Sequence, residues 1–215
     1  MKKIICLFVA VCLIMVTAFA AELTDVQKSD LYKLGIMVGD ENGNLRLDSN
    51  ITRAEAAKML CVAGSIKLSQ QSGDFKDVAE SHWAYGYINA AKEKGIINGD
   101  GSGNFNPNKN ITNEEIVKMI VCLLGYGEMA EMRGGYPAGY TALASNLGIT
   151  NGLKLKAETP AVRRDVAIMI FNALDIPLMA EKSKENEEED DSAVAYVIMD
   201  GKNGVPLSTL RKNIK

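Results

Sequence analysis

The chain has 215 residues, of which 24 are lysine or arginine and 27 are aspartate or glutamate, and its net charge at pH 7 is −3. This balance argues against a nucleic-acid-binding protein, which needs a basic face. A single histidine, His82, and the lack of a cysteine–histidine cluster also argue against a zinc site.

The first twenty residues have the pattern of a secretory signal peptide. Lys2 and Lys3 form a positive start, residues 4–16 are apolar, and Ala-Phe-Ala at 18–20 supplies the small residues of a cleavage site. The apolar run is shorter than the ~20 residues of a membrane span, so an uncleaved anchor is the weaker alternative. We expect an exported, soluble chain.

The body of the chain contains one segment twice, at an offset of 60 residues. A weaker third copy follows, with a loop three residues shorter and Gly148 in the place of Gly95. Each unit is too small to bury a core alone, so three stacked units would share one. The first two copies match at Gly35/95, Ile36/96, Gly39/99, Asp40/100, Gly43/103, Asn44/104, Asn50/110, Ile51/111, Thr52/112, Glu55/115, Lys58/118 and Met59/119.

The first half of each unit predicts a helix that ends at a glycine. In the middle unit, apolar residues at three- and four-residue spacing predict a helix over about 82–94, with Asp77 and Ser81 as candidate N-caps. Gly95 is typical of a left-handed C-cap. A loop rich in Gly, Asn and Asp follows, in which Phe105 is expected to plug into the core.

The second half of each unit predicts another helix, opened by a capping box. Thr112 with Glu115, and Thr52 with Glu55, have the spacing in which a hydroxyl and a carboxylate satisfy each other's backbone amides. These acids are therefore expected to be caps rather than catalysts. Two cysteines, Cys61 and Cys122, lie at near-equivalent places in these helices and are expected to be core residues rather than a disulfide.

The C-terminal part differs in composition. Residues 181–191 hold seven acids and two lysines, which is typical of a solvated linker. Residues 193–199 read as one strand, followed by the turn dipeptide Asp200-Gly201. One strand is not a domain, so this tail is either an adhesive extension or the start of an incomplete module.

The middle unit, from Phe75-Lys76-Asp77-Val78 through His82-Trp83-Ala84 to Gly103-Asn104-Phe105, resembles the S-layer homology (SLH) domain. Ile51-Thr52-Arg53-Ala54-Glu55 is similar to the ITRAE signature of that family. The resemblance implies an all-α fold of three helix-loop-helix repeats in a pseudo-threefold bundle, with a short C-terminal strand and tail. The expected parts are a signal peptide (1–20), repeats at 21–68, 73–128 and 134–179, an acidic linker (180–192) and an incomplete tail (193–215).

The resemblance also implies a function without catalysis. SLH repeats attach secreted proteins non-covalently to a secondary cell-wall polysaccharide, often a pyruvylated one, through grooves between repeats. We therefore expect a secreted protein of the cell wall or surface layer that is not an enzyme and uses no cofactor or metal. Its partners would be the wall polymer and possible further surface-layer proteins, with no nucleic acid and no membrane.

Five residues are candidates for binding the polysaccharide. Arg53, at the first turn of its helix, would join free backbone amides in holding an anion such as the carboxylate of a pyruvate ketal. Arg163 keeps the same register in the third unit. Trp83 and Tyr136 occupy matching places and could stack on sugars, and Gly99 would let a polymer approach the backbone. The simpler alternatives are a solvated Arg53, a core Trp83 and a purely turn-forming glycine.

The copies also differ from one another. Asn113 replaces the signature arginine in the second unit, and Leu23 stands where the second unit has Trp83. The third unit has Val162 at the cap but retains its arginine. We therefore predict at most two competent grooves, centred on Arg53 and Arg163.

Three other functions are compatible with parts of the sequence. A calcium loop at residues 40–51 lacks the required glycine at its sixth position, which is Leu45, and the acid at its twelfth, which is Ile51. An enzyme is disfavoured because no Ser-His-Asp or Cys-His set is available. The alternatives that stay open are an anchoring fragment of a longer surface enzyme and a purely structural surface-layer component.

Overall fold

The structure is a computed structural model that describes residues 21–69, 73, 75–181, 196–202 and 207–214. The predicted signal peptide and nearly all of the predicted acidic linker lie outside these residues. The described part is mainly helical, as predicted, with one two-stranded sheet. Its elements are α1 (Asp25–Lys33), α2 (Arg53–Ala63), α3 (Tyr85–Glu93), α4 (Asn113–Leu123), α5 (Gly127–Met132), α6 (Ala138–Asn146), α7 (Arg163–Ala173), β1 (Met179–Glu181), β2 (Tyr196–Ile198) and α8 (Leu210–Asn213).

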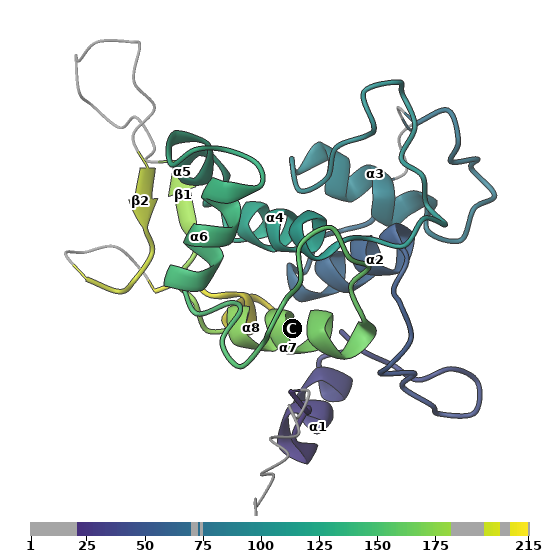
Figure 1. Ribbon diagram of the computed structural model, residues 1–215, viewed down its shortest axis with the longest axis horizontal. Helices are drawn as coiled ribbons and strands as arrows, with labels where there is room; N and C mark the ends of the chain where they lie inside the picture. Colours follow the sequence, from purple (N-terminus) through teal and green to yellow (C-terminus); the bar gives the residue numbers. More distant parts are fainter. Residues whose placement is uncertain (1–20, 70–72, 74, 182–195, 203–206, 215) are drawn as a thin grey trace, which may run out of the picture.

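The second helices of the three repeats, α2, α4 and α7, lie at the centre of the molecule (Figure 1). The first helix of each repeat packs on the second helix of the preceding one: α3 on α2, α6 on α4, and α1 on α7. Because each repeat packs on the one before it and the first packs on the third, the three repeats form a closed ring. One continuous hydrophobic core runs through all of them. The predicted pseudo-threefold arrangement of helix-loop-helix units is confirmed.

Three backbone hydrogen bonds mark the centre of the cycle. The amide of Ile51 donates to the carbonyl of Ala161 (3.1 Å), that of Ala161 to Ile111 (2.8 Å), and that of Ile111 to Ile51 (3.0 Å). All three side chains are fully buried. The residue before each capping position therefore ties one repeat to the next around a closed ring.

The second helix begins with a side-chain cap in two of the three repeats. Thr52 and Thr112 form complete capping boxes with Glu55 and Glu115, as predicted. At α7, Val162 has no hydroxyl to offer, yet the helix begins in the same register. The ring of backbone hydrogen bonds fixes that start without a side-chain cap.

The first helix of the middle repeat begins later than predicted. α3 starts at Tyr85 rather than His82, and its N-cap is Ala84. Asp77 does not cap it; its carboxylate accepts instead from the amides of Phe105 and Asn106, at 2.8 and 2.7 Å. These bonds hold the loop closed over the fully buried Phe105 side chain, which plugs the core as predicted.

The two described cysteines are packing residues. Cys61 is buried and its thiol donates to the carbonyl of Tyr87 at 3.3 Å, while Cys122 is half-buried, and both are free thiols in the described chain. Burial raises the pKa of Cys61 to about 12. The prediction of core thiols rather than a disulfide is confirmed.

The C-terminal segment folds back on the body. β2 pairs antiparallel with β1, with Met179 opposite Ile198, and a single bridge joins Pro177 to Thr209. Leu210 of α8 is buried. The predicted strand is present over Tyr196–Ile198, and it pairs with the segment that leaves the third repeat; the predicted residues 193–195 lie outside the described part of the chain.

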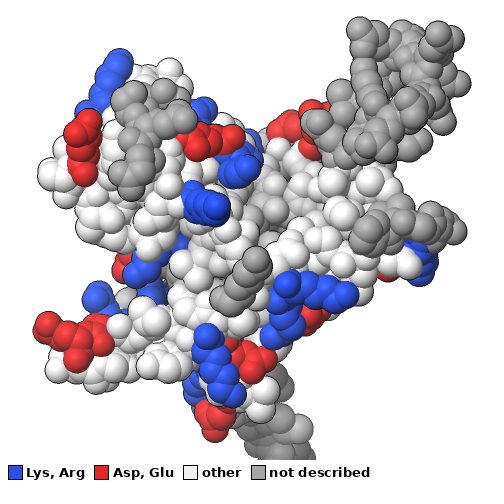
Figure 2. Space-filling view, turned by 180° about the vertical axis from the view of Figure 1, so that it is seen from behind, with Lys and Arg blue, Asp and Glu red and all other residues white. Residues whose placement is uncertain are grey.

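Charged side chains of both signs are spread over one face of the molecule (Figure 2). Acidic side chains stand next to basic ones over the face drawn in Figure 2. In the parts of the chain that the structure describes, every helix is too short or too polar to traverse a lipid bilayer.

Candidate functional site

Two equivalent grooves lie at two of the three junctions between repeats. The Arg53 groove has a volume of about 190 Å³ and the Arg163 groove one of about 290 Å³. Three repeats contribute to each groove. The first supplies an arginine, and the next supplies its second helix and its glycine loop, which is the Gly-, Asn- and Asp-rich segment between its two helices. The remaining repeat supplies an aromatic side chain. In the Arg53 groove these parts are Arg53, Asn98–Asp100, Glu115, Lys118, Met119 and Tyr136, and in the Arg163 groove they are Arg163, Val38–Asp40, Glu55, Lys58, Met59 and Trp83.

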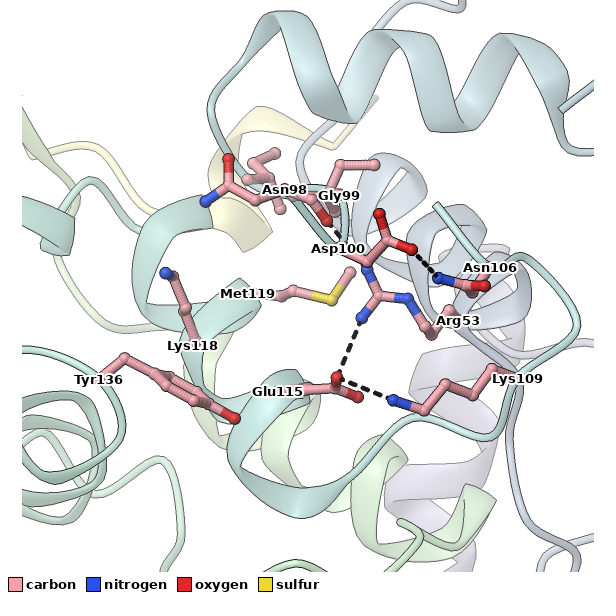
Figure 3. A pocket seen from close by; sticks show the side chains of 12 residues that line it. Arg53, Asn98, Gly99, Asp100, Asn106, Lys109, Glu115, Lys118, Met119 and Tyr136 are labelled. Carbon is pink, nitrogen blue, oxygen red and sulfur yellow. Dashed lines mark hydrogen bonds and ion pairs between the residues drawn. The ribbon is translucent and has the colours of Figure 1, made fainter. Parts of the chain in front are cut away.

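Arg53 spans the junction between repeats 1 and 2. Its Nε donates to the carbonyl of Phe105 (2.8 Å) and its Nη2 to the carbonyl of Asn98 (3.0 Å), while Nη1 lies 3.5 Å from Glu115 Oε1. Its guanidinium also covers the Phe105 ring at 4.7 Å. Only 11% of the side chain is exposed. Arg53 therefore braces the groove as well as lining it (Figure 3).

The backbone amides beside Arg53 are not free, so that part of the sequence prediction is wrong. The capping box of α2 uses two of them. The amides of Arg53 and Ala54 donate to the carbonyls of Lys109 and Pro107, at 2.9 and 3.0 Å. Closure of the threefold ring consumes the donors that a helix start would otherwise offer to an anion.

Lys118 supplies the more available charge in this groove. Its ammonium lies 5.4 Å from the ring centre of Tyr136 and 5.1 Å from that of Tyr140, in cation–π contact. Tyr136 is 48% exposed. In Figure 3, Lys118 and Tyr136 stand on one side of the groove and the Asn98–Asp100 loop on the other, with Met119 between them.

The charge of each groove is positive. Three basic side chains face two carboxylates in both: Arg53, Lys109 and Lys118 in one, and Arg46, Lys58 and Arg163 in the other. Burial, with Glu115 adding to it, raises the pKa of Tyr136, so its phenol stays neutral near pH 7. The Arg53 groove thus combines excess positive charge with an aromatic ring and an uncharged hydroxyl.

The aspartate of each glycine loop holds the loop together. Asp100 Oδ1 accepts from the amides of Ser102 and Asn104, which with two asparagine side chains hold its pKa well below the usual range. Asp40 accepts in the same way from Asn42 and Asn44. Within the described residues, no group of three histidines, cysteines or acids is placed to hold a metal ion.

Gly99 has a packing role in its groove. A Cβ there would lie 2.7 Å from the carbonyl oxygen of Asn104 and 2.8 Å from the Phe75 ring. Gly39 is crowded equally, by the backbone of Gly43 at 2.5 Å. Both glycines are required for the loop to fold tightly, whatever approaches it from outside.

The Arg163 groove repeats this plan between repeats 3 and 1. Arg163 Nη2 donates to the carbonyl of Val38 (3.4 Å), and Nη1 lies 3.7 Å from Glu55. Trp83 is 57% exposed and stacks on His82, which excludes a core role for it. Among the described residues, the ammonium of Lys58 has no ion-pair or cation–π partner.

The third junction, between repeats 2 and 3, is built differently. Asn113 is buried, and its amide donates to the carbonyl of Lys156 (2.9 Å) and the hydroxyl of Thr159 (3.0 Å). Ile168 occupies the place of Lys58 and Lys118 and is buried. A pocket of about 280 Å³ here has an apolar floor that includes Val117, Leu153 and Leu155.

The five residues predicted from the sequence all line the two grooves, and the structure adds two lysines that were not among the candidates. The structure places Arg53, Gly99 and Tyr136 in one groove, and Trp83 and Arg163 in the other. It adds Lys58 and Lys118. Both are identical at the 60-residue offset and are lost in the third unit, which is the signal that could have found them.

The first two repeats match a known family. Residues 29–57 and 74–116 match the S-layer homology domain. The chain is an S-layer homology domain protein. It is 30% identical to a cell surface protein of Thermoanaerobacter kivui over 69% of this chain and 20% of that protein. It is 33% identical to the middle cell wall protein of Brevibacillus brevis, over 76% and 17%.

Some SLH relatives are named as enzymes. An endoglucanase of a Bacillus species is 35% identical over 46% of this chain and 10% of that enzyme. The SLH chain thus spans a fifth or less of the lengths of these relatives. Together the family and the surface-layer relatives support a secreted, wall-associated SLH protein with a general role in cell-wall anchoring.

Proposed function

We propose that the chain anchors itself to the cell wall by binding an anionic secondary cell-wall polysaccharide in the Arg53 and Arg163 grooves. The observation that carries this proposal is the duplication of one constellation of side chains at two junctions. An arginine, a lysine, a glutamate and an exposed aromatic recur in the same relative places, although they come from three different repeats.

The chemistry of the grooves suits an acidic sugar. Lys58 and Lys118 supply positive charge for a carboxylate such as that of a pyruvate ketal, because the two arginines are largely engaged by backbone carbonyls. Trp83 and Tyr136 present exposed rings for a sugar face. In this account the arginines shape the groove and the lysines provide the more accessible charge.

A second candidate is that these repeats anchor a longer surface protein, such as an enzyme. It is favoured by the short span of the chain on its relatives, which include a protein named as an endoglucanase. The two candidates share the same grooves and differ only in what is carried to the wall. A purely structural role in a surface layer would not require the grooves.

Sedimentation with purified native cell-wall sacculi tests the proposal. The unaltered chain should sediment with the sacculi, and the Arg53→Ala, Arg163→Ala double variant should stay in solution. Lys156→Ala, at the third junction, is the matched control and should sediment normally. Equal sedimentation of all three proteins would refute the grooves, and failure of the unaltered chain would refute the function.

The nature of the ligand is tested on the same sacculi. Hydrofluoric acid removes phosphodiester-linked wall polymers, so extracted sacculi should no longer bind the chain. Binding that survives extraction would point to peptidoglycan instead. Adding a chelator should change nothing, whereas loss of binding would revive a calcium-dependent mechanism.

A further inference from the structure

The ring of three repeats is most weakly packed where it closes, between α1 and α7. α1 buries one residue, Leu31, whereas α3 and α6 each bury four. Because burial of apolar surface is the main stabilising term between packed helices, this contact should open most readily. The Arg163 groove is formed across the same junction, since Arg163 begins α7 and Val38 follows α1.

The C-terminal helix crosses this junction. Arg211 of α8 donates from Nε to both oxygens of Asp175, after α7, at 2.8 and 2.9 Å. Its Nη1 donates to Asp30 of α1 at 3.3 Å. Its guanidinium also lies 5.5 Å from the ring centre of Phe171 in α7. One side chain therefore connects the two helices whose own contact is small.

Further contacts hold α8 in place on the body. Leu210 is 2% exposed, and the amide of Arg211 donates to the carbonyl of Leu174 at 2.9 Å. At the far end, the hydroxyl of Ser65, just after α2, donates to the carbonyl of Asn213 at 3.0 Å. These contacts reach repeats 1 and 3, the two repeats that meet at the closing junction.

A short path links Arg211 to the groove. Asp30 precedes Leu31, whose carbonyl accepts from the amides of Ile36 and Met37 at 3.0 and 3.2 Å. The next residue is Val38, whose carbonyl accepts from Arg163. The position of α1 on α7 therefore sets the position of one groove wall.

We propose that residues 207–214 form a strap that closes the ring between repeats 3 and 1, and that Arg211 positions the Arg163 groove by holding α1 against α7. The strap part of this proposal is independent of any ligand. The positioning part rests on the proposed wall-binding function.

Hydrogen exchange tests the strap on the full chain without a ligand. In Arg211→Leu, exchange of the Ile36 and Met37 amides should become about three- to tenfold faster, the range expected for losing a partly exposed ion-pair cluster. The equivalent amides of Ile96 and Ile149, which donate to Ala91 and Ala144, should be unaffected. Unchanged exchange, or an equal rise in all three repeats, would overturn the strap.

Two companion variants sharpen the test. Arg211→Lys retains a positive charge but cannot contact Asp175 and Asp30 through two separate nitrogens, so its effect should be intermediate. Lys212→Ala changes an exposed neighbour on the same helix and should behave like the unaltered chain. An effect of Lys212→Ala as large as that of Arg211→Leu would also contradict the assignment to Arg211.

Binding to sacculi tests the positioning role. In a Lys118→Ala background, where the Arg53 groove is weakened, Arg211→Leu should lower the affinity for sacculi about three- to tenfold, and Arg211→Lys should recover part of it. Faster exchange without weaker binding would leave the strap standing and refute the positioning. If the unaltered chain fails to sediment, the wall-binding function and the positioning fall together, while exchange still decides the strap.

Discussion

The Arg53 junction and the Asn113 junction start from the same backbone plan and end with different surfaces. At the first, the long side chain of Arg53 donates hydrogen bonds to two carbonyls of the next repeat and borders a positively charged groove. At the second, the shorter amide side chain of Asn113 makes two hydrogen bonds to the next repeat and borders a pocket lined partly by apolar side chains. The difference teaches that the fold needs the backbone ring at each junction, while the groove chemistry can be lost at one of them.

The largest expected effect is a loss of binding without a loss of stability when both groove lysines are replaced. The Lys58→Ala, Lys118→Ala double variant should lose at least tenfold in affinity for sacculi, because it removes from each groove the lysine that lies beside the exposed aromatic ring. Its melting temperature should change little, since neither ammonium has a carboxylate partner among the described residues. Sedimentation and thermal unfolding measure the two quantities, and unchanged affinity would contradict the assignment of the charge to the lysines.

The next effect compares the two bracing side chains. Arg53→Ala should destabilise the chain by about 2–3 kcal/mol, because two carbonyls and Glu115 lose a mostly buried charged partner. Asn113→Ala should cost about 1 kcal/mol or less. The variant loses the two hydrogen bonds that Nδ2 donates, but it also removes Oδ1, which is buried and has no hydrogen-bond partner within the described part of the chain, and this offsets part of the loss.

Denaturant unfolding of these two variants measures the difference. Equal losses of unfolding free energy would mean that arginine and asparagine support their junctions to the same degree. A loss of about 1 kcal/mol or less for Arg53→Ala would refute its bracing role.

A smaller effect concerns the missing cap. Val162→Thr should restore the side-chain cap of α7 and stabilise the chain by about 0.5–1 kcal/mol, while Thr112→Ala should cost about 1 kcal/mol at α4. Thermal unfolding of both variants compares them directly. A destabilising Val162→Thr would show that the half-buried valine contributes more by packing than a hydroxyl would by capping.

The sequence was sufficient for features that depend on local spacing. The capping boxes at Thr52 and Thr112 and the buried Phe105 follow from residue types at fixed offsets. The threefold arrangement of the units was implied by the resemblance to the SLH family. The start of α3 was misplaced because Asp77, a good cap by type, is engaged by amides from a loop 28 residues away. Long-range bonds of that kind leave no local pattern.

The sequence named five candidate residues for the site, but it did not show how they are grouped. The grouping of Arg53 with Tyr136, and of Arg163 with Trp83, comes from different repeats that only the folded ring brings together. The amides expected to bind an anion are consumed by ring closure, which no single repeat could reveal. The docking of α8 likewise depends on Arg211 meeting acids from both ends of the ring.

The stoichiometry of binding tests the central claim most directly. Isothermal titration of the chain with soluble fragments released from the native wall polymer should give two sites on the unaltered chain. It should give one site on Lys118→Ala and one on Lys58→Ala, and the double variant should show no measurable binding. Three sites on the unaltered chain, or two sites that survive in the double variant, would contradict the account.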